Sequence, residues 1–317
     1  MKAWTINKYG GPEVLSFTDI DKPKIAKGKI VVEVHYAALN PYDYKLRNGI
    51  AKMMTGKKFP KVFGGDFAGV IVETNESTGN YPVGQKVYGF ANIFMREQGS
   101  LAEYTAISTK YVRPLPPGIE LIDACAMPSA GLTALNGILK CGELKDKKIL
   151  VNGATGGVGH LATQIFVARG GDVTAVCSTK NIPVAEKLGV DRVIDYSKES
   201  ALDRKTSYDI IYDAAATMNY SEAKKYLIKS GIYCTTEEGM NSALQLIRGK
   251  FNWSTSMALS SFRGKPEEFI EMEDLMTTHG VKPLIYQSFP FAEVDKAFET
   301  LENGRFYGKI LVNVKES

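Results

Sequence analysis

The stretch that decides the fold is KKILVNGATGGVGHLATQIFVARGG, residues 147–171. Its apolar run Ile149–Val151 is short, which is typical of a buried strand, and the run ends at a glycine-rich turn. After the turn, apolar side chains recur at helical spacing, with Leu161, Ile165 and Phe166 on one side. The stretch therefore predicts a strand, a tight turn and a helix in immediate succession.

The turn matches a nucleotide-binding motif. Residues 154–159 read ATGGVG, which is A-x-G-x-x-G with alanine in place of the usual first glycine, and VTAVC at 173–177 completes a β-α-β unit. In such a unit the glycines let the backbone approach a pyrophosphate, and the helix N-terminus holds its charge. A glycine-rich turn without a nucleotide is the alternative. The residues predicted to face the pyrophosphate are Ala154, Thr155, Gly156, Gly157 and Val158.

The end of the second predicted strand bears on the choice of cofactor. An NAD site usually carries Asp or Glu about 20 residues beyond the glycines. Here residues 177–181 read CSTKN, and no acidic residue follows until Glu186. Because a hydroxyl and an ammonium suit a 2′-phosphate, Ser178 and Lys180 predict NADPH rather than NADH. The alternative is that Lys180 is an ordinary solvated lysine.

The composition excludes several classes of function. The net charge of +4 comes from 39 basic and 35 acidic side chains without a long run of either sign, so we expect neither nucleic acid nor a membrane surface as a partner. No apolar run reaches the roughly 20 residues of a membrane span, and the N-terminus shows no targeting pattern, so we expect a cytoplasmic protein. The four cysteines (Cys125, Cys141, Cys177 and Cys234) lie far apart, which predicts reduced, buried thiols.

The chain changes character near its first third. About the first 120 residues are rich in strand-like segments such as Lys29–Leu39 and Gly69–Glu73, and they predict a β-rich, partly open barrel. Helical periodicity begins at Leu121–Leu139. Strands and helices then alternate, which predicts a doubly wound parallel sheet in an α/β fold. The further predicted strands are 193–194, 209–213, 232–236, 283–289 and 309–314, and the further predicted helices are 220–228 and 293–301.

These residues resemble a known family along almost the whole chain. The chain is similar to the zinc-independent quinone oxidoreductase and enone reductase branch of the medium-chain dehydrogenase/reductases. The segments that carry the resemblance are YGGPEVL (9–15), NPYDYK (40–45), FGGDFAGV (63–70), LAEY (101–104), AGLTA (130–134), the glycine turn, DY (195–196) and GKI (308–310).

The resemblance implies a GroES-like catalytic domain, a Rossmann domain and a homodimer. We expect the GroES-like domain at 1–122 with 283–317 returning to it, and the Rossmann domain at 123–282. In zinc-binding relatives a Cys stands near Asn40 and a Gly-His-Glu near Gly64–Asp66, and here both the Cys and the His are missing. The first 120 residues also contain no Cys that could bind a structural zinc. We therefore expect no metal.

Without a metal to polarise an alcohol, the resemblance favours reduction of a small-molecule quinone or of the C=C of an α,β-unsaturated carbonyl. The alternatives are a zinc-type alcohol dehydrogenase and a non-enzymatic, crystallin-like NADPH-binding protein. Residues 90–100 and 251–262 are expected to border the substrate cleft, with core or dimer interface as the alternative.

The resemblance also implies roles for individual residues. Asn40 and Thr133 would position the nicotinamide, its ribose or the substrate oxygen, although Asn40 before a proline also suits a turn. Tyr44 would donate to an enolate, with a buried aromatic as the alternative, and Asp43 and Asp66 would be scaffold. Ser178, Lys180 and Tyr196 would surround the 2′-phosphate, Ala214 and Thr235 would line the nicotinamide side, and Lys309 would approach the cofactor.

Overall fold

The computed structural model describes residues 1–93, 98–202, 206–236, 255–260 and 264–315. The chain divides into two compact units, one formed by Met1–Ser129 with Ile285–Ser317 and the other by Ala130–Leu284. The boundaries expected from the sequence lie after residues 122 and 282. Within the described ranges, no helix is long and apolar enough to cross a membrane.

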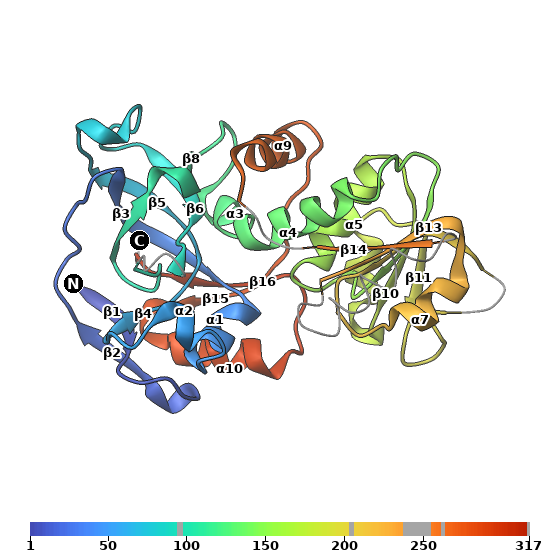
Figure 1. The fold of residues 1–317 in the computed structure, drawn as a ribbon, viewed down its shortest axis with the longest axis horizontal. Coiled ribbons are helices and arrows are strands. Elements are labelled where there is room, and N and C mark those ends of the chain that lie inside the picture. Colours follow the sequence, from blue (N-terminus) through green and yellow to red (C-terminus); the bar gives the residue numbers. More distant parts are fainter. Residues whose placement is uncertain (94–97, 203–205, 237–254, 261–263, 316–317) are drawn as a thin grey trace. The chain divides into compact units, whose positions relative to one another are not determined.

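The second unit is built on a six-stranded, fully parallel sheet (Figure 1). The unit begins with β9 in the middle of the sheet, adds β10 and β11 on one side, and then adds β12, β13 and β14 on the other side. The boundary between β9 and β12 is therefore the topological switch point of a doubly wound sheet. The predicted parallel sheet is thereby confirmed. In spatial order the strands are β11 (Arg192–Asp195), β10 (Asp172–Cys177), β9 (Lys148–Asn152), β12 (Tyr208–Asp213), β13 (Leu227–Thr235) and β14 (Thr255–Leu259).

The helices of the second unit follow the apolar pattern of the sequence. Helix α5 (Gly159–Ala168) begins directly after the glycine turn, and Leu161, Ile165 and Phe166 are buried as their spacing predicted. Among the described residues, the other α-helices are α4 (Pro128–Leu139), α6 (Ile182–Glu186), α7 (Tyr220–Ala223) and α9 (Pro266–Thr277).

One predicted helix is shorter than expected. The segment 220–228 forms α7 and a single 3-10 turn, Lys224–Tyr226, and strand β13 already begins at Leu227. Leu227 pairs with Tyr208 of β12 and is buried against the sheet. The apolar pair at 227–228 fits a helix and a strand equally, so the pairing with β12 decides its conformation.

The first unit is organised around β3 (Lys29–Leu39), whose bounds the sequence predicted. This strand pairs with β5 (Asp66–Glu73), β7 (Tyr104–Ser108) and, from the C-terminal end of the chain, β16 (Lys309–Asn313). The seven-stranded sheet continues through β6 (Lys86–Phe90) and β8 (Val112–Pro114) on one side and β15 (Ile285–Pro290) on the other. A second sheet contains β2 (Leu15–Asp19), β1 (Lys2–Ile6) and β4 (Lys61–Val62).

In the part of the first unit that the structure describes, three short α-helices and one longer α-helix pack around these sheets. They are α1 (Pro41–Arg47), α2 (Lys52–Thr55), α3 (Leu121–Cys125) and α10 (Val294–Asn303). Helix α10 packs Val294, Phe298 and Leu301 into the core of this unit. The buried guanidinium of Arg47 lies 2.9 Å from the carboxylate of Glu302 and over the ring of Phe298, so α1 and α10 are joined by a charged contact.

We expect Glu302→Ala to destabilise the protein by about 3 kcal/mol, because it leaves the buried Arg47 charge without its ion partner. Glu299→Ala removes an exposed carboxylate from the same helix and is the matched control. Urea unfolding measures both. Equal free energies of unfolding for the two variants would show that the pair does not stabilise the fold.

Candidate active site

Asn40 stands where β3 ends and α1 begins. Pro41 occupies the first position of the helix, which its fixed φ favours, and Asp43 lies in the first turn. The Asp43 carboxylate accepts the backbone N–H of Asn40 at 2.8 Å. This cap fixes the direction in which the chain leaves the sheet, so the position of the Asn40 side chain is set by local structure.

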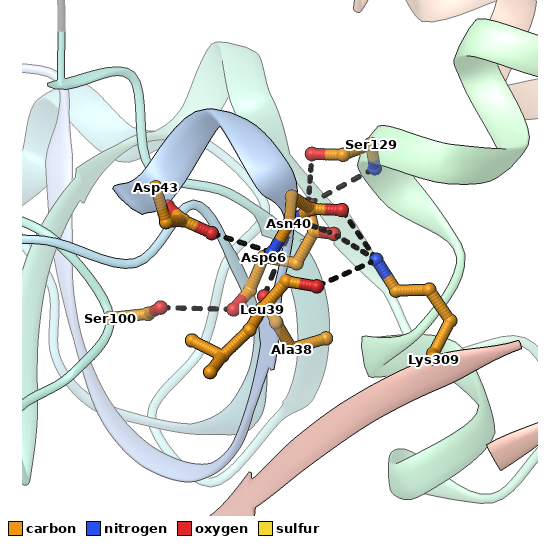
Figure 2. A network of polar contacts seen from close by, with 8 residues as sticks. All are labelled: Ala38, Leu39, Asn40, Asp43, Asp66, Ser100, Ser129 and Lys309. Carbon is orange, nitrogen blue, oxygen red and sulfur yellow. Dashed lines mark hydrogen bonds and ion pairs between the residues drawn. The ribbon is translucent and has the colours of Figure 1, made fainter. Parts of the chain in front are cut away.

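The Asn40 amide is held from both ends (Figure 2). Its Nδ2 donates to Asp66 Oδ2 at 2.9 Å and more weakly to the carbonyl of Ala38, while its Oδ1 accepts from Lys309 Nζ at 2.5 Å. Both amide hydrogens of Asn40 are therefore engaged by groups of the protein.

Asp66 and Lys309 form a buried ion pair beside Asn40. Asp66 is completely buried and Lys309 is 2% exposed, and the ammonium lies 3.6 Å from Asp66 Oδ2. The other carboxylate oxygen accepts the backbone N–H and the hydroxyl of Ser129. Burial raises the pKa of Asp66, and the Lys309 charge opposes this shift. We call Asn40, Asp66, Ser129 and Lys309 the polar cluster.

Lys309 is therefore part of the interior of the first unit. Its Nζ also donates to the carbonyl of Leu39 at 3.3 Å, in addition to its contacts with Asn40 and Asp66. The position follows from the pairing of β16 with β3, in which Ile310 lies opposite Leu39. Its expected approach to the cofactor stays a prediction.

The phenol next to the polar cluster belongs to Tyr42. A Cβ built on Gly65, the residue before Asp66, would lie 1.5 Å from the Tyr42 hydroxyl, so this hydroxyl fills the space of a side chain at 65. Tyr44, which the sequence favoured, is partly buried and packs against the apolar core of the unit. The absence of a side chain at Gly65 was the sequence signal for space beside Asp66.

In the second unit the glycine turn keeps backbone donors available. Gly153 has a φ of +73°, and a Cβ on Gly159 would lie 2.0 Å from the Gly153 carbonyl, so the turn requires glycine at both places. Among the described residues, the N–H groups of Gly157 and Val158 donate to no protein acceptor. With the N-terminus of α5 directly behind them, they suit an anion.

The other residues of the turn lie deeper. Ala154 and Thr155 are buried, and the Thr155 hydroxyl accepts from the side chain of Asn181 at 3.1 Å. Gly156, Gly157 and Val158 are partly exposed. The three partly exposed residues are thus the part of the predicted stretch that a pyrophosphate can reach in this conformation.

The region predicted for the 2′-phosphate lies where β10 and β11 end. Ser178 is partly exposed, and Lys180 and Tyr196 are exposed. Asp195, to which the sequence assigned no role in the site, ends β11 and pairs with Cys177. Its carboxylate accepts hydrogen bonds from the hydroxyls of Thr179 and Ser197. These bonds, chiefly the one from Thr179, lower the pKa of Asp195 to about 2.

The remaining predicted residues of the second unit make mostly internal contacts. Thr235 is buried and donates to the carbonyl of Asp213, whereas Ala214 follows β12 and is partly exposed. Thr133 lies on α4, where its carbonyl accepts the hydroxyl of Ser260. Asn40 and Thr133 belong to different units. The structure brings Asn40 together with Lys309.

Two expected cleft borders are only partly described. Residues 94–97 of the segment 90–100, and residues 251–254 and 261–262 of the segment 251–262, lie outside the described residues. Within the described ranges, no three His, Cys, Asp or Glu side chains gather as metal ligands, and the four cysteines are buried and free. The expected absence of a metal stays a prediction.

Asp43 predicts a dependence of stability on pH. Burial raises its pKa to about 7, so between about pH 4 and pH 7 the folded protein keeps a proton that the unfolded chain releases. The free energy of unfolding should therefore fall by up to about 1.4 kcal/mol per pH unit in this range. Asp43→Asn should remove the contribution of Asp43 to this fall in the free energy of unfolding. Urea unfolding at several pH values measures it, and parallel profiles of wild type and variant would contradict the raised pKa of Asp43.

Comparison with known proteins identifies the family. A model of the alcohol dehydrogenase GroES-like domain matches residues 26–117, and one of a zinc-binding dehydrogenase matches residues 188–312. The chain is 32% identical to 2-methylene-furan-3-one reductase of Solanum lycopersicum, covering 99% of this chain and 79% of that protein. It is 31% identical to a mitochondrial NAD(P)H oxidoreductase of Mus musculus, and the match covers 99% of this chain and 89% of that protein.

A solved structure agrees with the sequence relatives. The quinone oxidoreductase from Coxiella burnetii superimposes with a TM-score of 0.88 at 28% identity, and the match covers 99% of both chains. The predicted fold class is thereby confirmed. The chain belongs to the medium-chain dehydrogenase/reductase superfamily, among relatives that are named quinone oxidoreductases and enone reductases.

Proposed function

We propose that this protein is an NADPH-dependent enzyme that transfers hydride, without zinc, to a quinone or to the C=C of an α,β-unsaturated carbonyl. The observation that carries the proposal is the polar cluster, in which a buried ammonium stands beside Asn40. Relatives named as a furanone reductase, an alkenal/one oxidoreductase and a quinone oxidoreductase support the substrate class.

The residues around Asn40 do not suit a divalent cation. The ammonium of Lys309 donates to Asn40 Oδ1 and lies 3.6 Å from Asp66, so a metal here would meet a buried positive charge. Gly65 contributes no ligand, and the Tyr42 hydroxyl fills the space next to it. These contacts support reduction of an electron-poor double bond, which does not need a Lewis acid.

The glycine turn suits NADPH. The N–H groups of Gly157 and Val158 would hold the pyrophosphate, and Ser178 and Lys180 would receive the 2′-phosphate. Asp195 is close by, but its oxygens already accept from Thr179 and Ser197. When bound, the cofactor supplies the hydride.

The first unit would hold the other reactant. Asn40 would position the nicotinamide, its ribose or the substrate oxygen through its amide oxygen, and the family resemblance implies the same kind of role for Thr133. Asp66 and Lys309 would keep the Asn40 amide in one orientation, because both of its ends are bonded to them. Their role is positioning.

The proposal also includes a homodimer in the cytoplasm that binds a small molecule and neither nucleic acid nor membrane. These points rest on the composition and on the family resemblance. Size-exclusion chromatography with light scattering tests the dimer directly.

The activity is tested by following NADPH oxidation with small enones, long-chain enones and quinones, and repeating each assay with NADH. We expect turnover of at least one enone or quinone and a preference for NADPH. Tight NADPH binding without turnover of any acceptor would overturn the proposed reaction and favour a binding protein.

Lys180→Ala should raise the KM for NADPH roughly tenfold and leave the KM for NADH unchanged, because it removes one charged contact with the 2′-phosphate. Lys187→Ala, which also removes an exposed lysine just beyond α6, is the matched control. Initial rates at varied cofactor concentration give both constants. An unchanged KM for NADPH would remove Lys180 from the site.

A further inference from the structure

Ser129 joins the polar cluster through the carboxylate of Asp66 (Figure 2). It is 8% exposed, and two of its donors point at one atom, the Oδ1 oxygen of Asp66. The backbone N–H of Ser129 lies 3.0 Å from this oxygen and its hydroxyl oxygen 2.5 Å. Hydrogen bonds to an ionised acceptor are shorter and stronger than neutral ones, so this end of the carboxylate is firmly held.

The backbone of Asp66 is fixed by the sheet. Asp66 is the first residue of β5, it lies opposite Ala38 of β3, and its carbonyl accepts the hydroxyl of Ser100 at 2.9 Å. The carboxylate plane is less restricted, because the last torsion of an aspartate side chain has broad minima. The two bonds from Ser129 to Oδ1 therefore restrict the rotation that would carry the other oxygen, Oδ2, away from Asn40.

Oδ2 is the atom of Asp66 that orients Asn40. It accepts from Asn40 Nδ2 at 2.9 Å and lies 3.6 Å from Lys309 Nζ. An ionised carboxylate only accepts and an ammonium only donates, so together they favour one orientation of the amide, with its nitrogen toward Asp66 and its oxygen toward Lys309. A protonated Asp66 can also donate, and the reversed amide then has a partner at this end. The orientation of Asn40 therefore depends on both the rotation and the charge of Asp66.

Ser129 also favours the charged form of Asp66. Burial raises the pKa of this carboxyl, and the Lys309 ammonium is the largest of the effects that oppose the rise. The hydrogen bonds from Ser129 and Asn40 oppose it as well. The Ser129 hydroxyl can be removed by mutation while the ion pair of Asp66 with Lys309 stays in place.

Three more titratable groups face Asp66 from neighbouring helices. They are Tyr42 and Asp43 on α1 and Cys125 on α3. Burial first, and the charge of Asp66 after it, raise the pKa of each of them. These groups are present in wild type and in any variant of Ser129, so a difference between the two proteins reports on Asp66.

We propose that Ser129 is a positioning residue of this enzyme: by holding Oδ1 of Asp66, it keeps the Asn40 amide in the orientation that receives the nicotinamide, its ribose or the substrate oxygen. The inference rests on the proposed function, in which Asn40 has that role. Ser129 acts through Asp66. Loss of its hydroxyl therefore loosens the orientation of Asn40 without removing a group that touches cofactor or substrate.

The first measurement is the titration of Asp66 in cofactor-free protein, followed by carbon NMR of the aspartate carboxyl groups, with Asp66→Asn to assign the signal. Ser129→Ala removes the hydroxyl and keeps the backbone N–H. We expect the Asp66 midpoint to rise by about one pH unit in this variant, because a hydrogen bond to a charged group is lost. Ser288→Ala is the matched control and should leave the midpoint unchanged, since the Ser288 hydroxyl donates to the side chain of Asn313 at 2.5 Å in the same unit.

The second measurement is the pH profile of kcat for an enone. Protonation of Asp66 releases the Asn40 amide, so kcat should fall at low pH, and this acid limb should move to higher pH in Ser129→Ala. At neutral pH the variant should lose roughly tenfold in kcat, because the carboxylate is held by one bond fewer. Ser129→Thr keeps a hydroxyl and should restore the wild-type profile. Ser129→Cys is a second variant with a weaker donor, and both of its shifts should lie between those of Ser129→Ala and wild type.

The inference requires both changes in Ser129→Ala and in Ser129→Cys. An unchanged Asp66 midpoint, an unchanged acid limb, or a fall in kcat that is equal at all pH values would each overturn it, the last by showing that Ser129 only stabilises the first turn of α4. These results leave the proposed function intact, because turnover by wild type decides it. A wild-type protein that reduces no enone and no quinone would overturn the proposed function and the role of Ser129 together.

Discussion

The contact between Lys309 and Asn40 is the constraint on which the first unit depends. It joins the first residue of β16 to the residue that follows β3, although they are 269 positions apart in the chain. A buried ammonium is tolerated there only because Asn40, Leu39 and Asp66 surround it with acceptors. The C-terminal strand thus completes both the sheet and the polar cluster.

The same contact accounts for the chemistry that we propose. A site with a buried positive charge and an amide bonded at both ends is rigid and disfavours a metal. It suits a substrate whose oxygen gains negative charge during the reaction, because the protein then has to supply a hydrogen-bond donor and a fixed geometry. The second unit contributes separately, through backbone donors at the switch point of a parallel sheet.

Much of the fold could be predicted because its signals are local. The bounds of Lys29–Leu39 follow from alternation, and the strand, turn and helix around Gly156 follow from apolar spacing and glycine. The segment 220–228 shows the limit of such signals, since Leu227 is drawn into a strand by its partner on β12. The pairing of β16 with β3 is also long-range, so the burial of Lys309 could not be read from the residues near it.

The sequence could say only part of what the structure shows around Asn40, for the same reason. Asn40 was singled out from its motif, and the structure shows which atoms fix its amide. The surroundings of Tyr44 could not be read from the sequence, because they depend on where α1 begins and on how the ring packs against the core of the first unit. The contacts of Asp195 could not be predicted, because its place beside Cys177 comes from the parallel pairing of β10 with β11.

The most direct test of the central claim is to measure the zinc content of purified protein that is turning over an enone. The account predicts active protein with far less than one zinc per chain, and no gain in rate when zinc is added. About one zinc per chain, with activity that is lost when the metal is removed and restored when it returns, would contradict it.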